Sequence, residues 1–185
     1  MASVLVPLAE GCEELEAVTI IDLLRRAGIE VVVAGLEGGL VRCSRGTVIC
    51  PDASLGQALQ KEYDMVVLPG GQPGSNNLEK DSRIRELLVR MAQSNKFTAA
   101  ICAAPKVLAS AGLLQDRNAT SFPGVLEDMQ VSGLKYRQDP VVRDGNVITS
   151  RGPGTAMDFA LELIELLSGK PKRDEVESGL QRPVQ

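Results

Sequence analysis

Short apolar runs alternate with longer amphipathic segments along the whole sequence. Five of these runs lack the apolar–polar alternation of a strand with one face in water. They therefore predict the strands of a sheet that is covered on both faces. The predicted strands span residues 4–8, 31–34, 65–68, 98–101 and 147–149.

The segments between these runs predict amphipathic helices. The helices are expected at about residues 14–27, 82–94, 103–111 and 154–168, with a shorter one at 172–180. Strands that alternate with helices in this way predict an α/β fold with a doubly wound, mostly parallel sheet and helices on both faces. Residues 40–49, with Gly46 near the middle, predict a small antiparallel hairpin appended to that sheet. No repeat or linker interrupts residues 1–185, which predicts a single domain.

Composition excludes several classes of function. The 185 residues include 20 Lys and Arg against 24 Asp and Glu, which gives a net charge of −4. The chain has no block of basic residues, so we do not expect sequence-specific nucleic acid as a partner. Histidine is absent from the whole chain. Hydrolases with a Ser-His-Asp or Cys-His arrangement, and zinc sites with histidine ligands, are thereby excluded.

The cysteines are too dispersed for a metal knuckle or a C-x-x-C redox pair. They are Cys12, Cys43, Cys50 and Cys102. The N-terminal segment has no basic region, since Arg25 is the first cation, and no apolar run is long enough to cross a bilayer. We therefore expect a cytoplasmic protein with reduced thiols, no metal and no membrane partner.

Sites in doubly wound sheets form where the carboxyl ends of strands meet the N-termini of helices. Four loops qualify here: residues 9–13, 69–75, 102–105 and 151–155. The glycine-rich loop 69–75 matches no nucleotide-binding pattern. It suits a backbone N–H donor to an oxyanion, although an ordinary turn would have the same composition. Loop 151–155 ends a predicted strand and begins a predicted helix, so its residues, taken alone, indicate a structural role.

Cys102 follows a predicted strand directly and precedes a predicted helix. A strand that turns straight into a helix exposes its turn residue, as in a nucleophile elbow. The alanines at 99, 100, 103 and 104 would allow so tight a turn. A thiol at a helix N-terminus is expected to have a lowered pKa. The alternative is a buried structural cysteine, which is the commoner role of a free cysteine.

Glu16 shares the apolar face of the first predicted helix with Ile20, Leu23 and Ala27. A carboxyl on a buried face is costly unless it is protonated or has a partner. We therefore expect either a carboxyl with a raised pKa that points toward the strand ends or, alternatively, an ordinary solvated acid.

These features together resemble the ThiJ/PfpI superfamily, in particular the branch of the Parkinson-disease-associated protein deglycase and bacterial YajL. The resemblance covers nearly the whole chain, and the blocks around Gly71 and Cys102 are specific when they occur together. The matching segments are E-E-L-E at 13–16, R-R-A-G-I at 25–29, C-S-R-G at 43–46, V-V-L-P-G-G at 66–71, A-A-I-C-A-A-P at 99–105 and S-R-G-P-G-T at 150–155.

The resemblance implies a flavodoxin-like fold, a homodimer and chemistry without a cofactor. It implies that Cys102 is an easily oxidised nucleophile and that Glu16 is a protonated carboxyl hydrogen-bonded to its sulfur. The backbone N–H groups of Gly71 and Ala103 would form the oxyanion site.

The resemblance extends to residues farther from the nucleophile. Arg45 and Arg26 would lie near the entrance of the site, where family members accept small anions. Cys50 would lie near the dimer contact, and Cys43 would be a second peripheral thiol. Phe122 occupies the position at which some relatives carry a catalytic histidine, so any proton carrier must be Glu16, water or the substrate.

Two kinds of function follow from the resemblance. The first is a cofactor-independent glyoxalase III or protein deglycase that acts on methylglyoxal, glyoxal or their early adducts through Cys102, with Glu16 as proton carrier. The alternative is an oxidative-stress sensor or redox-regulated chaperone that uses the sulfinate of Cys102 without significant turnover. A peptidase is disfavoured, because no histidine is present to activate the thiol or protonate an amine.

Overall fold

The computed structural model describes residues 1–182, which fold around a seven-stranded sheet in the order β10-β11-β7-β6-β1-β2-β5. All neighbouring strands pair in parallel except β10 and β11. The predicted mostly parallel, flavodoxin-like α/β sheet is therefore confirmed. The strands are β1 (Ser3–Leu8), β2 (Glu30–Gly35), β5 (Ala53–Ser54), β6 (Met65–Leu68), β7 (Phe97–Ile101), β10 (Val141–Asp144) and β11 (Val147–Ser150).

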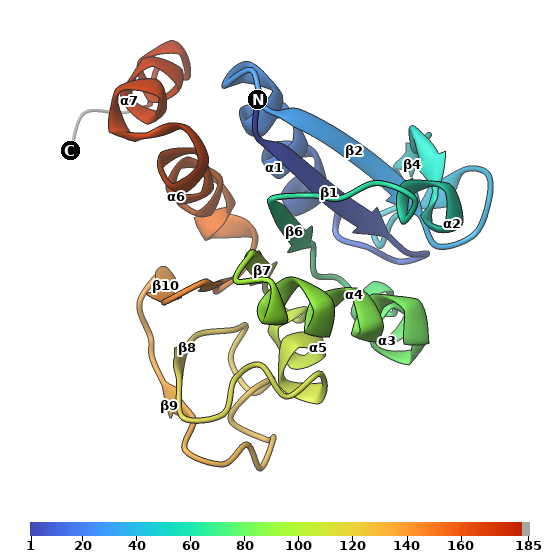
Figure 1. Ribbon diagram of the computed structural model, residues 1–185, viewed down its shortest axis with the longest axis vertical. Coiled ribbons are helices and arrows are strands. Elements are labelled where there is room, and N and C mark those ends of the chain that lie inside the picture. Colours follow the sequence, from blue (N-terminus) through green and yellow to red (C-terminus); the bar gives the residue numbers. More distant parts are fainter. Residues whose placement is uncertain (183–185) are drawn as a thin grey trace.

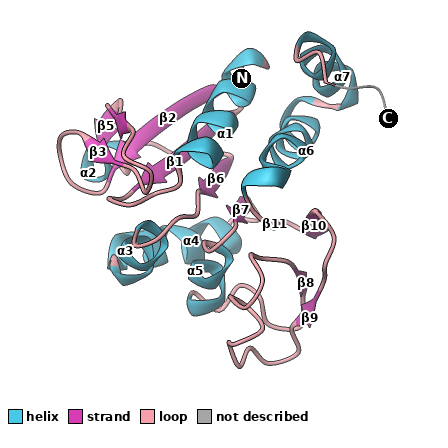
Figure 2. Cartoon of the chain, turned by 180° about the vertical axis from the view of Figure 1, so that it is seen from behind, coloured by secondary structure: helices cyan, strands magenta, loops and turns pink. Residues whose placement is uncertain are grey.

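Helices cover both faces of this sheet (Figures 1 and 2). One face carries α1 (Glu14–Arg26), α6 (Ala156–Ser168), which follows the 3₁₀ turn η1 (Pro153–Thr155), and α7 (Lys170–Gly179). The other face carries α2 (Leu55–Ala58), α3 (Gly74–Lys80), α4 (Ser82–Gln93) and α5 (Pro105–Ser110).

The two covered faces explain why the strands lack polar alternation. In β1, Val4, Val6 and Leu8 pack into the core beneath α1 and α6, whereas Leu5 packs into the core beneath α4 and α5. All four side chains are completely buried. Successive side chains of a strand point to opposite faces, so each face here requires an apolar residue.

The structure differs from the predicted elements in its smaller features. The hairpin forms as β3 (Val41–Arg42) and β4 (Val48–Ile49), but it is a separate two-stranded sheet and not an appendage of the main one. The sequence pattern does not predict α2, α3, β5, β10 or the short pair β8 (Asn118–Ala119) and β9 (Lys135–Tyr136). These elements are short or, like α3, mostly polar, so they carry little periodicity.

Candidate active site

Cys102 lies in a tight turn between the end of β7 and the start of α5, as the sequence predicted. Its φ angle of 62° is in the left-handed region, which costs a residue other than glycine about 1–3 kcal/mol. Two backbone hydrogen bonds hold it there: its N–H donates to the Ser150 carbonyl at 2.9 Å, and its carbonyl accepts from the Phe122 N–H at 2.8 Å. The backbone of Cys102 is thus fixed by the end of β11 and by the loop that contains Phe122.

Glu16 lies in the first turn of α1 and is completely buried, so the predicted burial of this carboxyl is confirmed. Its Oε2 atom accepts the Gly70 N–H at 2.8 Å. Its Oε1 atom is buried without a nitrogen or oxygen partner, and the Cys102 thiol is close enough to hydrogen-bond the carboxyl. Burial raises the pKa of Glu16 to about 7, against the opposing effects of the Gly70 N–H and the thiol.

The Cys102 sulfur is surrounded by groups with opposite effects on its charge. Burial, then the negative charge of Glu16 and the hydrogen bond to it, raise the pKa of the Cys102 thiol to about 12. Hydrogen bonds from the backbone N–H groups of Gly71 and Ala103 act in the opposite direction. The expectation of a lowered thiol pKa was therefore wrong, because burial and the neighbouring carboxylate outweigh the N–H donors.

These opposing effects make Glu16 and Cys102 a coupled acid pair. Above a pH of about 7, the value of the Glu16 pKa, the pair holds one proton in place of two. Transfer of that proton from sulfur to Glu16 would remove the repulsion and leave a thiolate facing two N–H donors. The arrangement can therefore produce a nucleophilic sulfur next to a protonated carboxyl without a histidine.

Gly70 is the residue of this site whose role the sequence did not predict. A Cβ atom at this position would lie 2.6 Å from the Cβ of Cys102 and 2.8 Å from Oε2 of Glu16. Only glycine leaves room for the thiol and the carboxyl to approach each other here. The Gly-Gly pair after a predicted strand was the available signal. The adjacent Gly71, at a φ of 90°, packs against the backbone of residues 11–13.

The two predicted arginines have partners other than Glu16 and Cys102. Arg26 lies in the last turn of α1 and pairs with Asp22 at 2.6 Å. Ten residues of helix separate it from Glu16, about 15 Å along the axis. Arg45 lies in the exposed turn between β3 and β4, where its backbone N–H donates to the Glu14 carboxylate. Neither guanidinium makes a hydrogen bond to Glu16 or Cys102 within residues 1–182.

The remaining predicted positions lie at different distances from the nucleophile. Phe122 is directly beside it, through the N–H that donates to the Cys102 carbonyl, and its side chain is half exposed. Cys50 is exposed next to β4. Cys43 is buried against Cys12, so the expectation of a peripheral thiol was wrong for its side chain.

The described part of the chain, residues 1–182, contains no cluster of three or more Cys, Asp or Glu side chains placed to hold a metal ion. Over the same residues, no helix has both the length and the apolar character needed to span a bilayer.

Comparisons with known proteins find similar chains over nearly the whole length of this one. Residues 2–166 match the family model of the DJ-1/PfpI family. Protein dj-1beta of Drosophila melanogaster is 49% identical over 180 residues, 96% of each chain. The crystal structure of Drosophila melanogaster DJ-1beta superposes with a TM-score of 0.94 and covers 99% of each chain at 48% identity. The glutathione-independent glyoxalase DJR-1.2 of Caenorhabditis elegans is 39% identical over 175 residues, covering 95% of this chain and 92% of that protein.

Proposed function

Since this chain belongs to the DJ-1/PfpI family, we propose that it is a cofactor-independent glyoxalase that converts methylglyoxal or glyoxal into the corresponding 2-hydroxy acid. The observation that carries the proposal is the buried pair of Glu16 and Cys102, with the sulfur facing the N–H groups of Gly71 and Ala103. The similarity to a protein described as a glutathione-independent glyoxalase supports the same assignment.

The proposed reaction begins with nucleophilic addition. The proton of the Cys102 thiol passes to Glu16, and the thiolate attacks the aldehyde carbon. The C=O π bond breaks, and its electrons form an oxyanion on the carbon bonded to sulfur. The backbone N–H groups of Gly71 and Ala103, which act to lower the pKa of the Cys102 thiol, would stabilise this developing charge. Protonation of the oxyanion by Glu16 gives a hemithioacetal.

The second stage moves one proton between neighbouring carbons. The Glu16 carboxylate removes the hydrogen of the former aldehyde carbon, the C–H electrons form a C=C bond, and the adjacent carbonyl becomes the oxygen of an enediolate. Glu16 then returns the proton to the adjacent carbon, and the hydroxyl proton of the hemithioacetal passes to the neighbouring oxygen, so that the carbon bonded to sulfur becomes a carbonyl. The product is a thioester of a 2-hydroxy acid. Water then hydrolyses the thioester, which releases the acid and restores the thiol. One water is consumed for each aldehyde, and no electrons enter or leave.

Glu16 is the proton carrier that this chain offers at Cys102. The chain contains no histidine, and Phe122 presents a hydrocarbon ring at the position next to the nucleophile. A pKa of about 7 suits Glu16 to both accept and donate a proton near neutral pH. The same addition chemistry would extend to early glyoxal adducts of proteins, which is the deglycase form of the proposal.

We further propose that the protein acts in the cytoplasm as a homodimer. Leu15 and Val18 on α1 and Val48 on β4 are apolar side chains that are about half exposed. A shallow groove that includes Val18 and Cys50 lies between α1 and β4. A second copy of the chain would cover this apolar surface by a two-fold interface, the commonest closed symmetry.

The experiment that tests the enzymatic proposal is conversion of methylglyoxal to lactate in the absence of glutathione. We expect turnover by the wild-type protein and a loss of at least about 10²-fold in Cys102→Ser. The matched control is Cys50→Ser, which should retain wild-type turnover because Cys50 lies next to β4 and outside the site. Absence of turnover in a folded wild-type protein whose Cys102 is readily oxidised to sulfinate would contradict the proposal and favour a redox sensor.

A further inference from the structure

Two buried thiols away from Cys102 face each other across two different loops. Cys12 lies in the loop after β1, and Cys43 lies at the start of the turn between β3 and β4. Their Sγ atoms are 3.5 Å apart, and both cysteines are free. They are 31 positions apart in the sequence, so no local motif indicated the contact.

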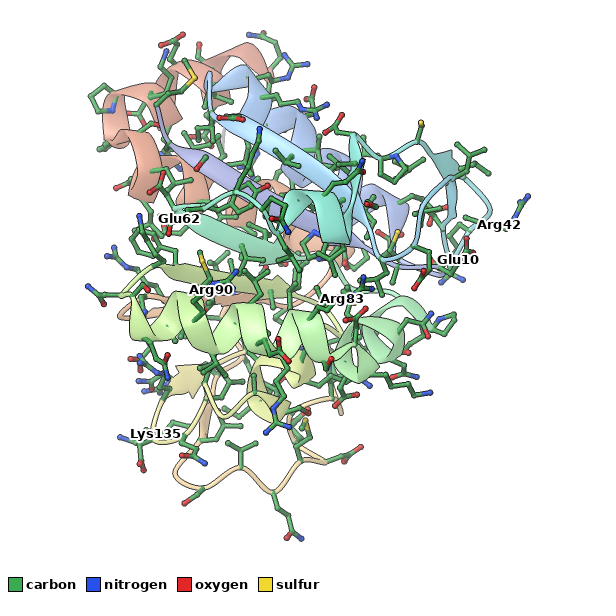
Figure 3. All side chains as sticks on the ribbon, turned by 45° about the vertical axis from the view of Figure 1, so that its right-hand side comes forward. Glu10, Arg42, Glu62, Arg83, Arg90 and Lys135 are labelled. Carbon is green, nitrogen blue, oxygen red and sulfur yellow. The ribbon has the colours of Figure 1, made fainter. Side chains whose placement is uncertain are left out.

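The backbone around this thiol pair is held in place on both sides. The Gly11 N–H donates to the Arg42 carbonyl at 2.8 Å, and the Ser44 N–H donates to the Cys12 carbonyl at 2.8 Å. The Glu10 carboxylate accepts the Arg42 N–H at 3.1 Å. Figure 3 shows Glu10 and Arg42 next to each other at this edge of the molecule. The two segments therefore lie side by side with their sulfur atoms already in contact.

We propose that Cys12 and Cys43 are a redox site that closes to a reversible intramolecular disulfide. An S–S bond of about 2.05 Å requires the sulfur atoms to approach by about 1.5 Å from their present contact. The proposal requires that rotation of the two side chains supplies this movement while the flanking backbone hydrogen bonds are kept. The site is independent of Cys102 and of the proposed glyoxalase reaction.

A peroxide is a sufficient oxidant for this step. Hydrogen peroxide oxidises Cys43 to a sulfenic acid: an S–O bond forms, the O–O bond breaks and one water leaves. The Cys12 sulfur then attacks the Cys43 sulfur, the S–O bond breaks and a second water leaves. Two thiols and one peroxide thus give one disulfide and two waters. A thiol reductant reverses the bond by exchange.

Cys43 is the point of entry for the oxidant. Its side chain is 5% exposed, whereas Cys12 is completely buried, and residues 45–47 of the adjoining turn are exposed. Burial, followed by the negative charges of Glu14 and other nearby acids, raises the pKa of Cys43, and burial likewise raises the pKa of Cys12. Both thiols are therefore protonated near neutral pH and should react slowly with peroxide.

Closure of the disulfide would join the β3–β4 hairpin covalently to the loop that supports the candidate active site. That loop continues from Cys12 into Glu13, whose N–H donates to the Gly70 carbonyl at 3.0 Å. A cross-link between positions 31 apart restricts the unfolded chain and should raise the melting temperature. We expect the disulfide to hold the β3–β4 hairpin against the loop that contains Cys12 under oxidising conditions, and we call this role the clamp.

Peptide mapping of the oxidised full-length protein tests the proposal. Cleavage after Lys and Arg places the four cysteines in four separate peptides: residues 1–25, 43–45, 46–61 and 97–106. After treatment with peroxide and alkylation of the remaining thiols, we expect peptide 1–25 linked to peptide 43–45, with the loss of two hydrogens, and release of the link by reductant. A link from peptide 43–45 to peptide 46–61, or free Cys12 and Cys43 when Cys50 and Cys102 are fully oxidised, would overturn the proposal.

Matched variants test the clamp. Oxidation should raise the melting temperature of the wild type and of Cys50→Ala by about 5 °C or more, and reductant should reverse the rise. Cys12→Ala and Cys43→Ala should each show no such rise. Formation of the disulfide without a rise in melting temperature would contradict the clamp, and an equal rise in Cys12→Ala would show that another modification causes it.

Discussion

Glu16 and Cys102 determine each other's protonation, so neither residue can be understood alone. Glu16 would be an ordinary acid if it were solvated, and its burial raises its pKa to about 7. Its charge in turn helps to raise the pKa of Cys102 to about 12. The reactive form is consequently the pair with one proton, in which that proton can move from sulfur to the carboxyl.

This account predicts how turnover depends on pH. Below the Glu16 pKa of about 7, both groups hold a proton and the pair cannot transfer one to form the thiolate. We expect kcat/KM for methylglyoxal to rise about tenfold per pH unit below this value and to level off above it. Initial rates between pH 5 and 9 measure the profile. A kcat/KM that falls as the pH rises through 7 would show that the doubly protonated pair is the reactive form.

At the level of single residues, the sequence predicted positions better than ionisation. The helical spacing of Glu16 with Ile20 predicted its burial, and the run of small residues around Cys102 predicted the tight turn. The direction of the Cys102 pKa shift was wrong, because it depends on a carboxylate 86 positions away whose approach is visible only in the folded chain. The ten-residue distance of Arg26 from Glu16 along one helix could also have been read from the sequence, and its expected place near the entrance of the site stays a prediction.

At the scale of secondary-structure elements and the loops that join them, the loop after β6 controls how closely Glu16 and Cys102 can approach each other. The Gly70 N–H binds Glu16, and the absence of a side chain at Gly70 admits Cys102 on the other side. Loop residues of this kind determine the site, whereas the strands only bring the loops to one edge of the sheet.

Gly70→Ala should therefore separate the carboxyl from the thiol. The φ angle of Gly70 is not positive, so alanine can adopt this backbone conformation. The effect of the substitution is therefore steric. We expect a loss of at least about tenfold in kcat/KM and a destabilisation of about 1–3 kcal/mol. The control is Gly56→Ala in α2, where a Cβ meets nothing within 4 Å. Steady-state kinetics and urea unfolding measure both effects, and wild-type turnover in Gly70→Ala would contradict the role of this loop.

The sequence also predicted long elements better than short ones. Helices α1, α4 and α6 bury an apolar stripe, and their periodicity placed them within a few residues of their observed bounds. In α3 the buried residues are Gly74, Ser75 and Leu78, so no periodic apolar pattern predicts the helix. The contact between Cys12 and Cys43 joins a loop to a hairpin and leaves no periodic signal in the sequence.

On the scale of the whole molecule, both faces of the sheet are covered, and the apolar surface that stays exposed includes part of α1 and β4. Val18 is 49% exposed on this surface. If a second copy covers it, a charge there would be buried without a partner in the dimer.

We therefore expect the wild type to sediment at twice the chain mass of 19.7 kDa, and Val18→Asp to sediment as a folded monomer at micromolar concentration. Val89→Asp on α4, on the opposite face of the sheet, is the control and should leave the dimer intact. A monomeric wild type, or a Val18→Asp protein that dimerises as strongly as the wild type, would contradict the proposed interface.

The central claim is that Glu16 carries the proton for Cys102, and the turnover of Glu16→Gln tests it most directly. Glutamine keeps the shape and can donate a hydrogen bond, but it cannot exchange a proton. The account predicts that kcat for methylglyoxal falls by at least about 10²-fold. The protein should stay folded, as should the control Glu86→Gln on the exposed side of α4, which should keep wild-type turnover. Near-wild-type turnover in Glu16→Gln would contradict the claim and leave water or the substrate as the proton carrier.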